Sequence, residues 1–368
     1  MVFGWLTGGR SERDTVSADS ESATGAAQLL DALIASLPDA AIVLDRETRV
    51  IAFNEAARVI APALSRGAAA SLALRVPEIV EAVRDVAAGS EPRSAEIYQR
   101  VPIDRWFMTH VRPVGAAPSM ILLVFQDLTP LRRSEEMRVD FVANASHELR
   151  TPLAALSGFI DTLLGSARDD ADARKRFLAI MKAQANRMTR LIGDLLSLSR
   201  VELNEHMHPV TPVDVVPVVR QVIDGLQTLA TDRGVEIAMT PPDRPMIVPG
   251  DRDELTRVFE NLIENALKYG ASGKRVDVGF SAASASNEAL VTIRDYGPGI
   301  AAEHIPRLTE RFYRVDVTQS RAEGGTGLGL ALVKHILNRH RGKLSIDSEA
   351  GKGATFSVRL PLVHSEST

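Results

Sequence analysis

The chain has 368 residues, which is long enough for two or three domains with separate hydrophobic cores. Its 45% hydrophobic and 24% charged residues are typical of a globular protein, and its net charge of -4 gives no reason to expect direct nucleic-acid binding. The absence of cysteine excludes disulfides, thiolate metal sites and a cysteine nucleophile. This composition suits a protein of the reducing cytoplasm.

The N-terminal region carries no segment that is expected to span a membrane. The most apolar stretch, residues 61–76, is interrupted by Arg66 and Arg75. The first residues, M-V-F-G-W-L, are apolar but too short to cross a bilayer, so membrane contact is expected only through this end or through a part outside the chain. Residues 1–27 lack periodicity and are expected to form a flexible segment.

Residues 28–129 are expected to form one compact α/β sensor domain. Asn54 is a suitable cap for a helix, and strand patterns cover 40–44, 49–53, 93–100, 106–114 and 119–126. The domain resembles a PAS domain in D-A-A-I-V-L-D and V-I-A-F-N-E-A-A, and in D-L-T at its end. Such domains can hold haem, flavin or metabolites, but His110 alternates within a strand and is expected to be a face residue rather than a ligand.

A long helical hairpin is expected over residues 130–203. Apolar residues recur at spacings of three and four from Val142 to Leu163, and again from Phe177 to Leu198. Two continuous apolar seams cannot both be covered within one hairpin, so we expect two copies to form a dimeric four-helix bundle.

His147 falls on the side of the first helix opposite to its apolar seam. A lone histidine there is usually a surface residue, but Glu148 follows it directly and Thr151 lies one turn along on nearly the same face. Pro152 removes a backbone donor and crowds the carbonyl of Glu148, which predicts a bend just after the histidine. An interior proline costs roughly 3 kcal/mol, so its presence favours a functional role for this stretch.

Residues 212–362 alternate helices and strands, which predicts an α/β sandwich with a mixed sheet and helices on one face, followed by a short tail at 363–368. Four motifs occur within it. The helix N-L-I-E-N-A-L-K-Y places Asn261, Asn265 and Lys268 on one face, where amide oxygens suit Mg²⁺ and an ammonium suits phosphate. The turn D-Y-G-P-G leaves the Asp295 carboxylate at a strand end, where it could accept a hydrogen bond from an adenine amino group.

The other two motifs are E-R-F-Y-R, which offers Arg314, and G-G-T-G-L-G-L, which runs into a helix N-terminus able to face phosphates. Between them, residues 316–323 are polar and expected to form a lid. Each motif alone has an ordinary explanation as a helix surface, a turn or a hinge. Their occurrence together and in this order favours a nucleotide site.

With these motifs, S-H-E-L-R-T-P-L identifies a resemblance to the sensor histidine kinases of two-component signalling, and most closely to the phosphate-regulon type. The resemblance implies a Bergerat-type ATP-binding domain that binds ATP and Mg²⁺. It also implies autophosphorylation of His147 and transfer to an aspartate of a response regulator, with phosphate as one candidate signal. The regulator is expected to carry a winged-helix DNA-binding output domain.

The resemblance also assigns roles to single residues. Glu148 would orient His147 and take its proton, and Thr151 would help to place a hydrolytic water for a phosphatase activity. Asn261 and Asn265 would hold Mg²⁺, and Lys268 and Arg314 would neutralise phosphate charge. The remaining expected nucleotide contacts are Tyr269, Asp295, Gly297, Gly299, Gly325, Gly327, Leu328 and Gly329.

Alternatives remain at this point. The chain is either a relative without membrane helices or a fragment of a membrane-anchored kinase. A non-catalytic signalling scaffold is a second class of function, and another ATPase of the same fold would leave the histidine helix unexplained. Phosphorylation within a subunit or across the dimer is equally open.

Overall fold

The computed structural model describes residues 25–89, 91–100, 104–115, 120–283, 287–316 and 324–363. The chain divides into two compact units, Met1–Asp140 and Phe141–Thr368. Most of the predicted flexible N-terminus, lid residues 317–323 and residues 364–368 of the predicted tail lie outside the described residues. Within the described ranges, no helix is both long and apolar enough to cross a membrane.

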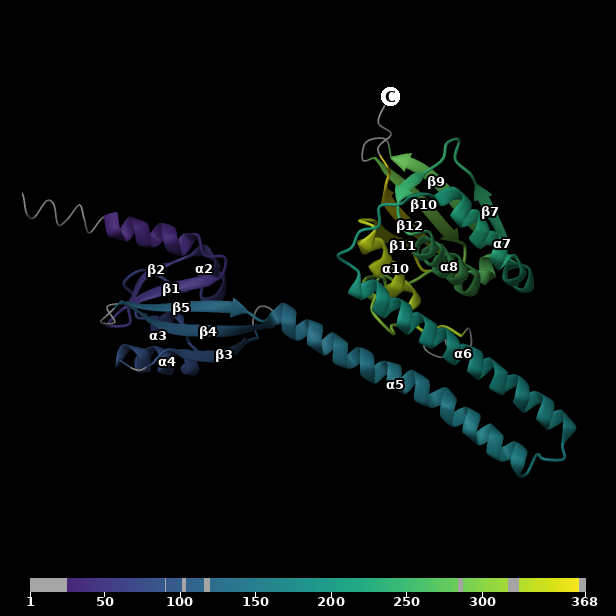
Figure 1. Ribbon diagram of the computed structural model, residues 1–368, viewed down its shortest axis with the longest axis horizontal. Helices are drawn as coiled ribbons and strands as arrows, with labels where there is room; N and C mark the ends of the chain where they lie inside the picture. Colours follow the sequence, from purple (N-terminus) through teal and green to yellow (C-terminus); the bar gives the residue numbers. More distant parts are fainter. Residues whose placement is uncertain are drawn as a thin grey trace, which may run out of the picture. The chain divides into compact units, whose positions relative to one another are not determined.

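The first unit is built on a five-stranded antiparallel sheet in the order β2-β1-β5-β4-β3 (Figure 1). Its strands are β1 (Ala40–Asp45), β2 (Val50–Phe53), β3 (Arg93–Gln99), β4 (Arg105–Val114) and β5 (Met120–Asp127). Between β2 and β3 lie the helices α2 (Glu55–Ile60), α3 (Ala70–Ala73) and α4 (Pro77–Ala87). The predicted strands are therefore present.

Asn54 shows how this unit is held together locally. Its Oδ1 accepts hydrogen bonds from the backbone N–H groups of Ala57 at 3.0 Å and Ala41 at 3.1 Å, so one side chain both caps α2 and ties it to β1. The core contains alternate apolar residues of the strands, including Ile42 and Phe125. His110 pairs with the Ser94 hydroxyl at 2.9 Å on the neighbouring strand, as expected of a residue on a strand face.

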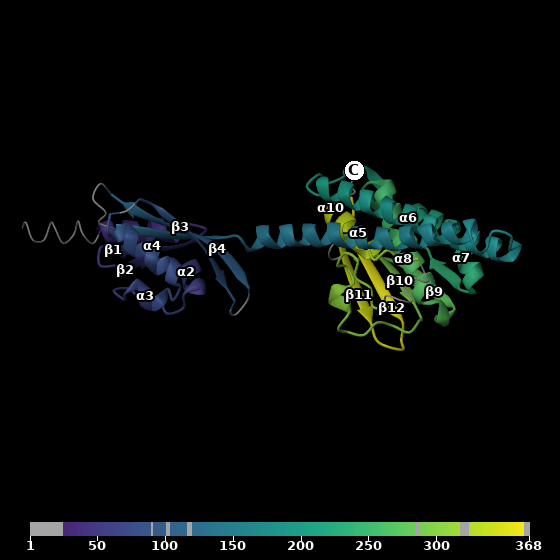
Figure 2. The same ribbon diagram turned by 90° about the horizontal axis from the view of Figure 1, so that it is seen from below.

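Two long helices, α5 (Thr129–Leu164) and α6 (Ala171–Leu203), form a hairpin (Figures 1 and 2). α5 starts in the first unit and continues into the second without interruption at Pro152, and α6 begins at its Asp170 cap. The rings of Phe159 and Phe177 stack across the hairpin at 5.3 Å. The bend predicted at Pro152 stays a prediction, because α5 is one continuous helix through this residue.

Part of the predicted apolar seam of the hairpin faces outward in the single chain. Val142, Leu153 and Ile160 are exposed, although the 3.6-residue periodicity predicts one buried face. α6, in contrast, contributes Leu191, Leu198 and Val201 to the core of the second unit. Both helices contact the α/β domain, since Phe141 and Leu149 of α5 also pack against its core, and both leave apolar side chains exposed, such as Ile192 and Leu196 of α6.

The α/β domain contains a mixed sheet in the order β11-β12-β10-β9-β7, in which β7 and β9 pair in parallel and the other neighbouring strands pair antiparallel. Its elements are β6 (Pro212–Asp214), α7 (Val215–Arg233), β7 (Glu236–Thr240), β8 (Ile247–Pro249), α8 (Arg252–Tyr269), β9 (Arg275–Ala283), β10 (Glu288–Asp295), α10 (Gly329–Arg339), β11 (Lys343–Ser348) and β12 (Ala354–Pro361). Helices α7, α8 and α10 cover one face of the sheet (Figure 1). The predicted α/β sandwich is confirmed.

Helix α8 has a capped start, a buried apolar face and an opposite polar face. Asp251 Oδ1 accepts hydrogen bonds from the N–H groups of Asp253 and Glu254 and so fixes the start of the helix. Apolar residues such as Phe259 and Leu262 are fully buried against the sheet. The opposite, polar face of α8 is left to line a cavity.

Candidate functional site

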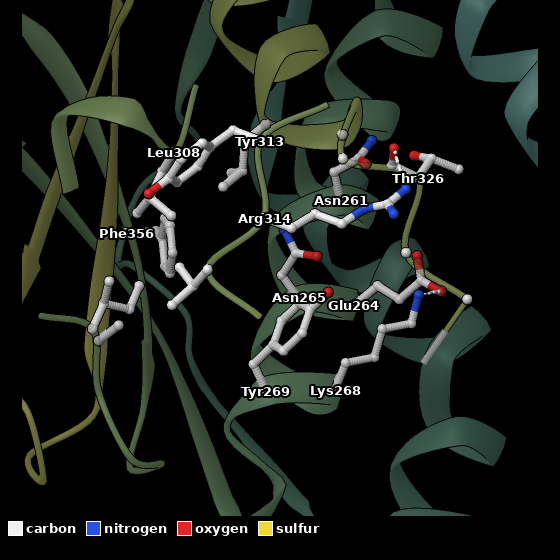
Figure 3. Close-up of a pocket in the computed structure, with 18 of the residues that line it drawn as sticks. Asn261, Glu264, Asn265, Lys268, Tyr269, Leu308, Tyr313, Arg314, Thr326 and Phe356 are labelled. Atoms are coloured by element: carbon white, nitrogen blue, oxygen red, sulfur yellow. Dashed lines mark hydrogen bonds and ion pairs between the residues drawn. The ribbon is translucent and has the colours of Figure 1, made fainter. Parts of the chain in front are cut away.

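A cavity of about 340 Å³ lies between α8, the turn after β10, residues 308–316 and residues 324–330 (Figure 3). Helix α8 lines it with Asn261, Glu264, Asn265 and Lys268, which follow one another at helical spacing. Lys268 Nζ pairs with Glu264 at 2.7 Å. The predicted amide and ammonium groups therefore line one cavity.

Asp295 lies at the end of β10 and is one of the few buried polar residues of the domain. One carboxylate oxygen, Oδ1, accepts hydrogen bonds from the backbone N–H of Gly297 at 2.9 Å and of Ala354 at 3.3 Å. Burial raises the pKa of Asp295, and these two hydrogen bonds oppose the increase. The carboxylate is thereby held in a defined orientation at the wall of the cavity.

Glycines allow the backbone to approach closely around the cavity. Gly299 has φ +70° and Gly327 has φ +74°, values that residues with a Cβ rarely adopt. A Cβ at Gly327 would lie 2.9 Å from the backbone of Phe312, and one at Gly329 would collide with the Asn261 amide. Gly299, Gly325, Gly327 and Gly329 all line the cavity, as expected for nucleotide contacts.

Two of the expected nucleotide contacts lie behind the cavity wall instead. Gly297 supports Asp295 through its N–H, and a Cβ there would lie 2.6 Å from Gly270 Cα. Leu328 is fully buried in the hydrophobic core, and its N–H donates to Thr326 Oγ1 at 3.3 Å. Neither lines the cavity. These two residues instead support neighbours that line the cavity, and membership of a motif cannot distinguish the two positions.

Arg314 connects the cavity to the histidine helix. Its side chain extends between Asn261 and Asn265 (Figure 3). Its guanidinium contacts both carboxylate oxygens of Glu148, with Nη1 3.3 Å from Oε1 and Nη2 3.0 Å from Oε2. Arg187 of α6 donates to the same Oε2 at 2.8 Å. His147 itself is exposed on α5, directly beside this buried ion-pair cluster.

Thr151 is exposed one turn beyond His147. Its hydroxyl donates to the backbone carbonyl of His147 at 3.2 Å, as helical threonines often do. The side chains of His147 and Thr151 are both exposed on the surface of α5. The structure places Thr151 beside the histidine but assigns it no catalytic contact.

Residues from α6 that the sequence analysis did not select also line the cavity. Asp194 accepts a hydrogen bond from the Thr326 hydroxyl at 2.8 Å, and Arg190 lies against Gly324. Burial raises the pKa of Asp194, and the Thr326 hydrogen bond opposes that increase. The signal that could have indicated Asp194 is a carboxylate within the apolar stretch L-I-G-D-L-L.

No cluster of three or more histidine, aspartate or glutamate residues able to hold a metal occurs in the described part of the chain. The Asn261 and Asn265 amides nevertheless suit Mg²⁺, which commonly takes one or two protein ligands, several waters and oxygens of a polyphosphate. The donor set therefore fits a cation that arrives with its nucleotide. It does not resemble a permanent metal centre.

Comparison with known families agrees with this geometry. The His Kinase A (phospho-acceptor) domain matches residues 137–204. The Histidine kinase-, DNA gyrase B-, and HSP90-like ATPase family matches residues 250–364. The first match contains the His147 helix, and the second contains α8, Asp295 and the glycine-rich loop.

Similar proteins are sensor kinases. The chain is 39% identical over 239 residues to the phosphate regulon sensor protein PhoR of Pseudomonas aeruginosa. The matched residues cover 65% of this chain and 53% of PhoR. The sensor histidine kinase WalK of Bacillus subtilis is 34% identical over 241 residues, covering 66% of this chain and 39% of WalK. The chain thus spans about half the length of PhoR and less of WalK.

The sensor-like histidine kinase SenX3 of Mycobacterium tuberculosis is similar over a longer range. It is 33% identical over 335 residues, which covers 91% of this chain and 80% of SenX3. The similarity therefore extends beyond the phospho-acceptor and ATPase regions and includes much of the first unit. On this evidence the chain belongs to the sensor histidine kinases.

Proposed function

We propose that this protein is an ATP-dependent protein-histidine kinase that phosphorylates its own His147 and passes the phosphoryl group to an aspartate of a response regulator. The observation that carries the proposal is the position of Arg314. Its guanidinium lines the cavity together with Asn261 and Lys268 and also pairs with Glu148, the neighbour of His147. A guanidinium suited to binding phosphate thus contacts the residue next to the proposed phosphorylation site.

Asp295 supports recognition of adenine. Its Oδ1 is occupied by two backbone N–H groups, so Oδ2 is the oxygen we assign to the adenine amino group. Tyr269 lines the same cavity and would offer an aromatic face to the base.

Lys268 and Arg314, which line the same cavity, offer positive charge to the phosphates. The backbone at Gly325 and Gly327 offers close approach to them. Asn265 and Asn261 would hold Mg²⁺, which would neutralise charge on the transferring phosphoryl group.

In the proposed step, an imidazole nitrogen of His147 attacks the γ-phosphorus of ATP. The new N–P bond forms as the P–O bond to ADP breaks, and ADP leaves with the electron pair. The proton displaced from the imidazole passes to Glu148, which is the adjacent carboxylate. Oε1 of Glu148 is contacted by Arg314 at 3.3 Å, so release of Arg314 would make this oxygen more available to the proton.

The exposed surface of α5 around His147 supports docking of a response regulator, and we propose a homodimer that covers the outward apolar seam of the hairpin. Thr151 would help to position water when the regulator is dephosphorylated. Similarity to PhoR supports a response to phosphate, and a winged-helix output domain of the regulator belongs to the same proposal.

The first unit is proposed to be a PAS sensor domain over residues 28–129. Its sheet order β2-β1-β5-β4-β3, with helices inserted between β2 and β3, supports this assignment. The bundle and the ATP-binding domain are proposed to cover residues 130–203 and 212–362.

Labelled ATP tests the proposal. Protein incubated with γ-labelled ATP and Mg²⁺ should acquire a label that acid removes and base does not, and the His147→Ala variant should acquire none. A matched control is His206→Ala, because His206 belongs to the same unit but lies outside the cavity lining. Failure of the intact protein to acquire label would leave the scaffold hypothesis, in which bound nucleotide only changes conformation.

A further inference from the structure

Glu148 is bound by two arginines that come from different parts of the second unit. Arg187 Nη2 lies 2.8 Å and Arg314 Nη2 lies 3.0 Å from the same atom, Glu148 Oε2. All three side chains are largely buried, with exposed fractions of 15% for Glu148, 14% for Arg187 and 3% for Arg314. Two cations therefore share one carboxylate in a site with little screening by water.

The two arginines differ in what else they can bind. Arg314 lines the nucleotide cavity, and its Nε is buried without a hydrogen-bond partner, which is a costly state for a charged donor. A phosphate oxygen in the cavity would offer acceptors to this guanidinium. Arg187 does not line the cavity. An incoming polyphosphate would therefore compete with Glu148 for Arg314, not for Arg187.

Arg187 also belongs to the same helical hairpin as Glu148, 39 residues further along the chain, whereas 166 residues separate Glu148 from Arg314. Helices α5 and α6 pack directly, as the Phe159–Phe177 stack shows. Movement of the ATP-binding domain toward His147 would thus change the Arg314 contact without separating the two hairpin residues.

We propose that Arg187 is a positioning residue for His147 phosphorylation: it holds and orients the Glu148 carboxylate while Arg314 turns to the γ-phosphate of ATP. Glu148 Oε2 stays on Arg187, and Oε1 is the oxygen that we assign to the imidazole proton. The N–P bond forms as ADP departs with the electron pair of the broken P–O bond. The inference rests on the proposed kinase function.

The test compares Arg187→Met and Arg187→Lys with Lys182→Met, which removes an exposed positive charge from the same helix. General base catalysis typically contributes about 10²- to 10⁴-fold, so poor orientation of Glu148 should lower the single-turnover rate of His147 phosphorylation about 10- to 100-fold in Arg187→Met. Affinity for ATP, measured by competition with a fluorescent nucleotide, should change less than about 2-fold, a minor free-energy difference. Arg187→Lys should recover part of the rate, and Lys182→Met should match the unmodified protein.

Three outcomes would overturn the inference while the intact protein still labels His147. They are an unchanged rate in Arg187→Met, a loss of ATP affinity as large as the loss of rate, and a lysine variant no faster than the methionine variant. Failure of the intact protein to label His147 would instead overturn the kinase proposal itself. Thermal unfolding of each variant shows whether a loss of rate comes from a loss of fold. If Arg187→Met does not fold, the rate of Arg187→Lys tests the inference, and this rate should lie below that of the unmodified protein.

Discussion

Replacing Asp295 with asparagine tests the proposed recognition of adenine without removing any atom of the site's framework. The asparagine side-chain oxygen can still accept hydrogen bonds from the backbone N–H groups of Gly297 and Ala354. In the unmodified protein these nitrogens lie 2.9 and 3.3 Å from Asp295 Oδ1. The amide nitrogen then takes the place of Oδ2. In Asp295→Asn, the atom that would face the adenine amino group therefore changes from a hydrogen-bond acceptor to a donor.

The expected loss follows from the lost hydrogen bond. A hydrogen bond to a charged group contributes about 1.5–3 kcal/mol, which corresponds to an about 10- to 150-fold weaker dissociation constant for ATP. Stability should not fall, because burial raises the pKa of Asp295 and so disfavours its charged form. The thermal midpoint of Asp295→Asn is therefore expected to equal or exceed that of the unmodified protein.

The assay is competition of ATP and GTP against a fluorescent nucleotide, with Asp347→Asn as the control. Asp347 is an exposed residue of β11 in the same domain, so its variant should bind both nucleotides normally. Guanine carries a carbonyl acceptor where adenine carries an amino donor. Asp295→Asn should therefore lose ATP affinity and improve its relative affinity for GTP.

Two results would refute this reasoning. One is unchanged ATP affinity in Asp295→Asn, which would mean that the carboxylate does not contact the base. The other is an equal loss for ATP and GTP together with a lower thermal midpoint, which would mean that Asp295 acts only through the structure of its turn.

The remaining predictions concern Thr151 and His340. Thr151→Ala should lower dephosphorylation of the phosphorylated regulator at least about 10-fold, which is less than the about 10²- to 10⁴-fold of general acid–base catalysis because the threonine would only position the water. Labelling of His147 should stay within about 2-fold. Unchanged dephosphorylation would remove the proposed role. Burial lowers the pKa of His340, whose Nε2 accepts the Asp251 N–H at 3.0 Å. The unfolded histidine binds a proton near pH ~6.5, whereas the folded one binds it only at lower pH. The free energy of unfolding should therefore fall as pH decreases below that value. Urea titrations should show a weaker pH dependence of this free energy in His340→Gln. An identical pH dependence in that variant would contradict the assignment.

Much of the fold and part of the site follow from local sequence rules. The cap at Asn54 and the alternation along the strands are local properties, so the elements that they define agree with the structure. The shared face of Asn261, Asn265 and Lys268 follows from the geometry of a single helix, and it could be predicted without knowledge of the tertiary structure.

Contacts between distant segments could not be derived in this way. Helical periodicity places Glu148 beside His147, but it contains no information about Arg314, 166 residues further on, or about Arg187 on the neighbouring helix. The same limit explains why Asp194 was missed, because its role depends on Thr326 of the glycine-rich loop. Motif membership also could not separate cavity contacts from the supporting residue Leu328.

Peptide mapping of the phosphorylated protein tests the central claim most directly. After incubation with ATP and Mg²⁺ under conditions that preserve phosphohistidine, fragmentation should locate one added phosphoryl group on His147, and Asn265→Ala should abolish it by removing the proposed Mg²⁺ ligand. A phosphoryl group on a different residue, or full modification of His147 in Asn265→Ala, would contradict the account.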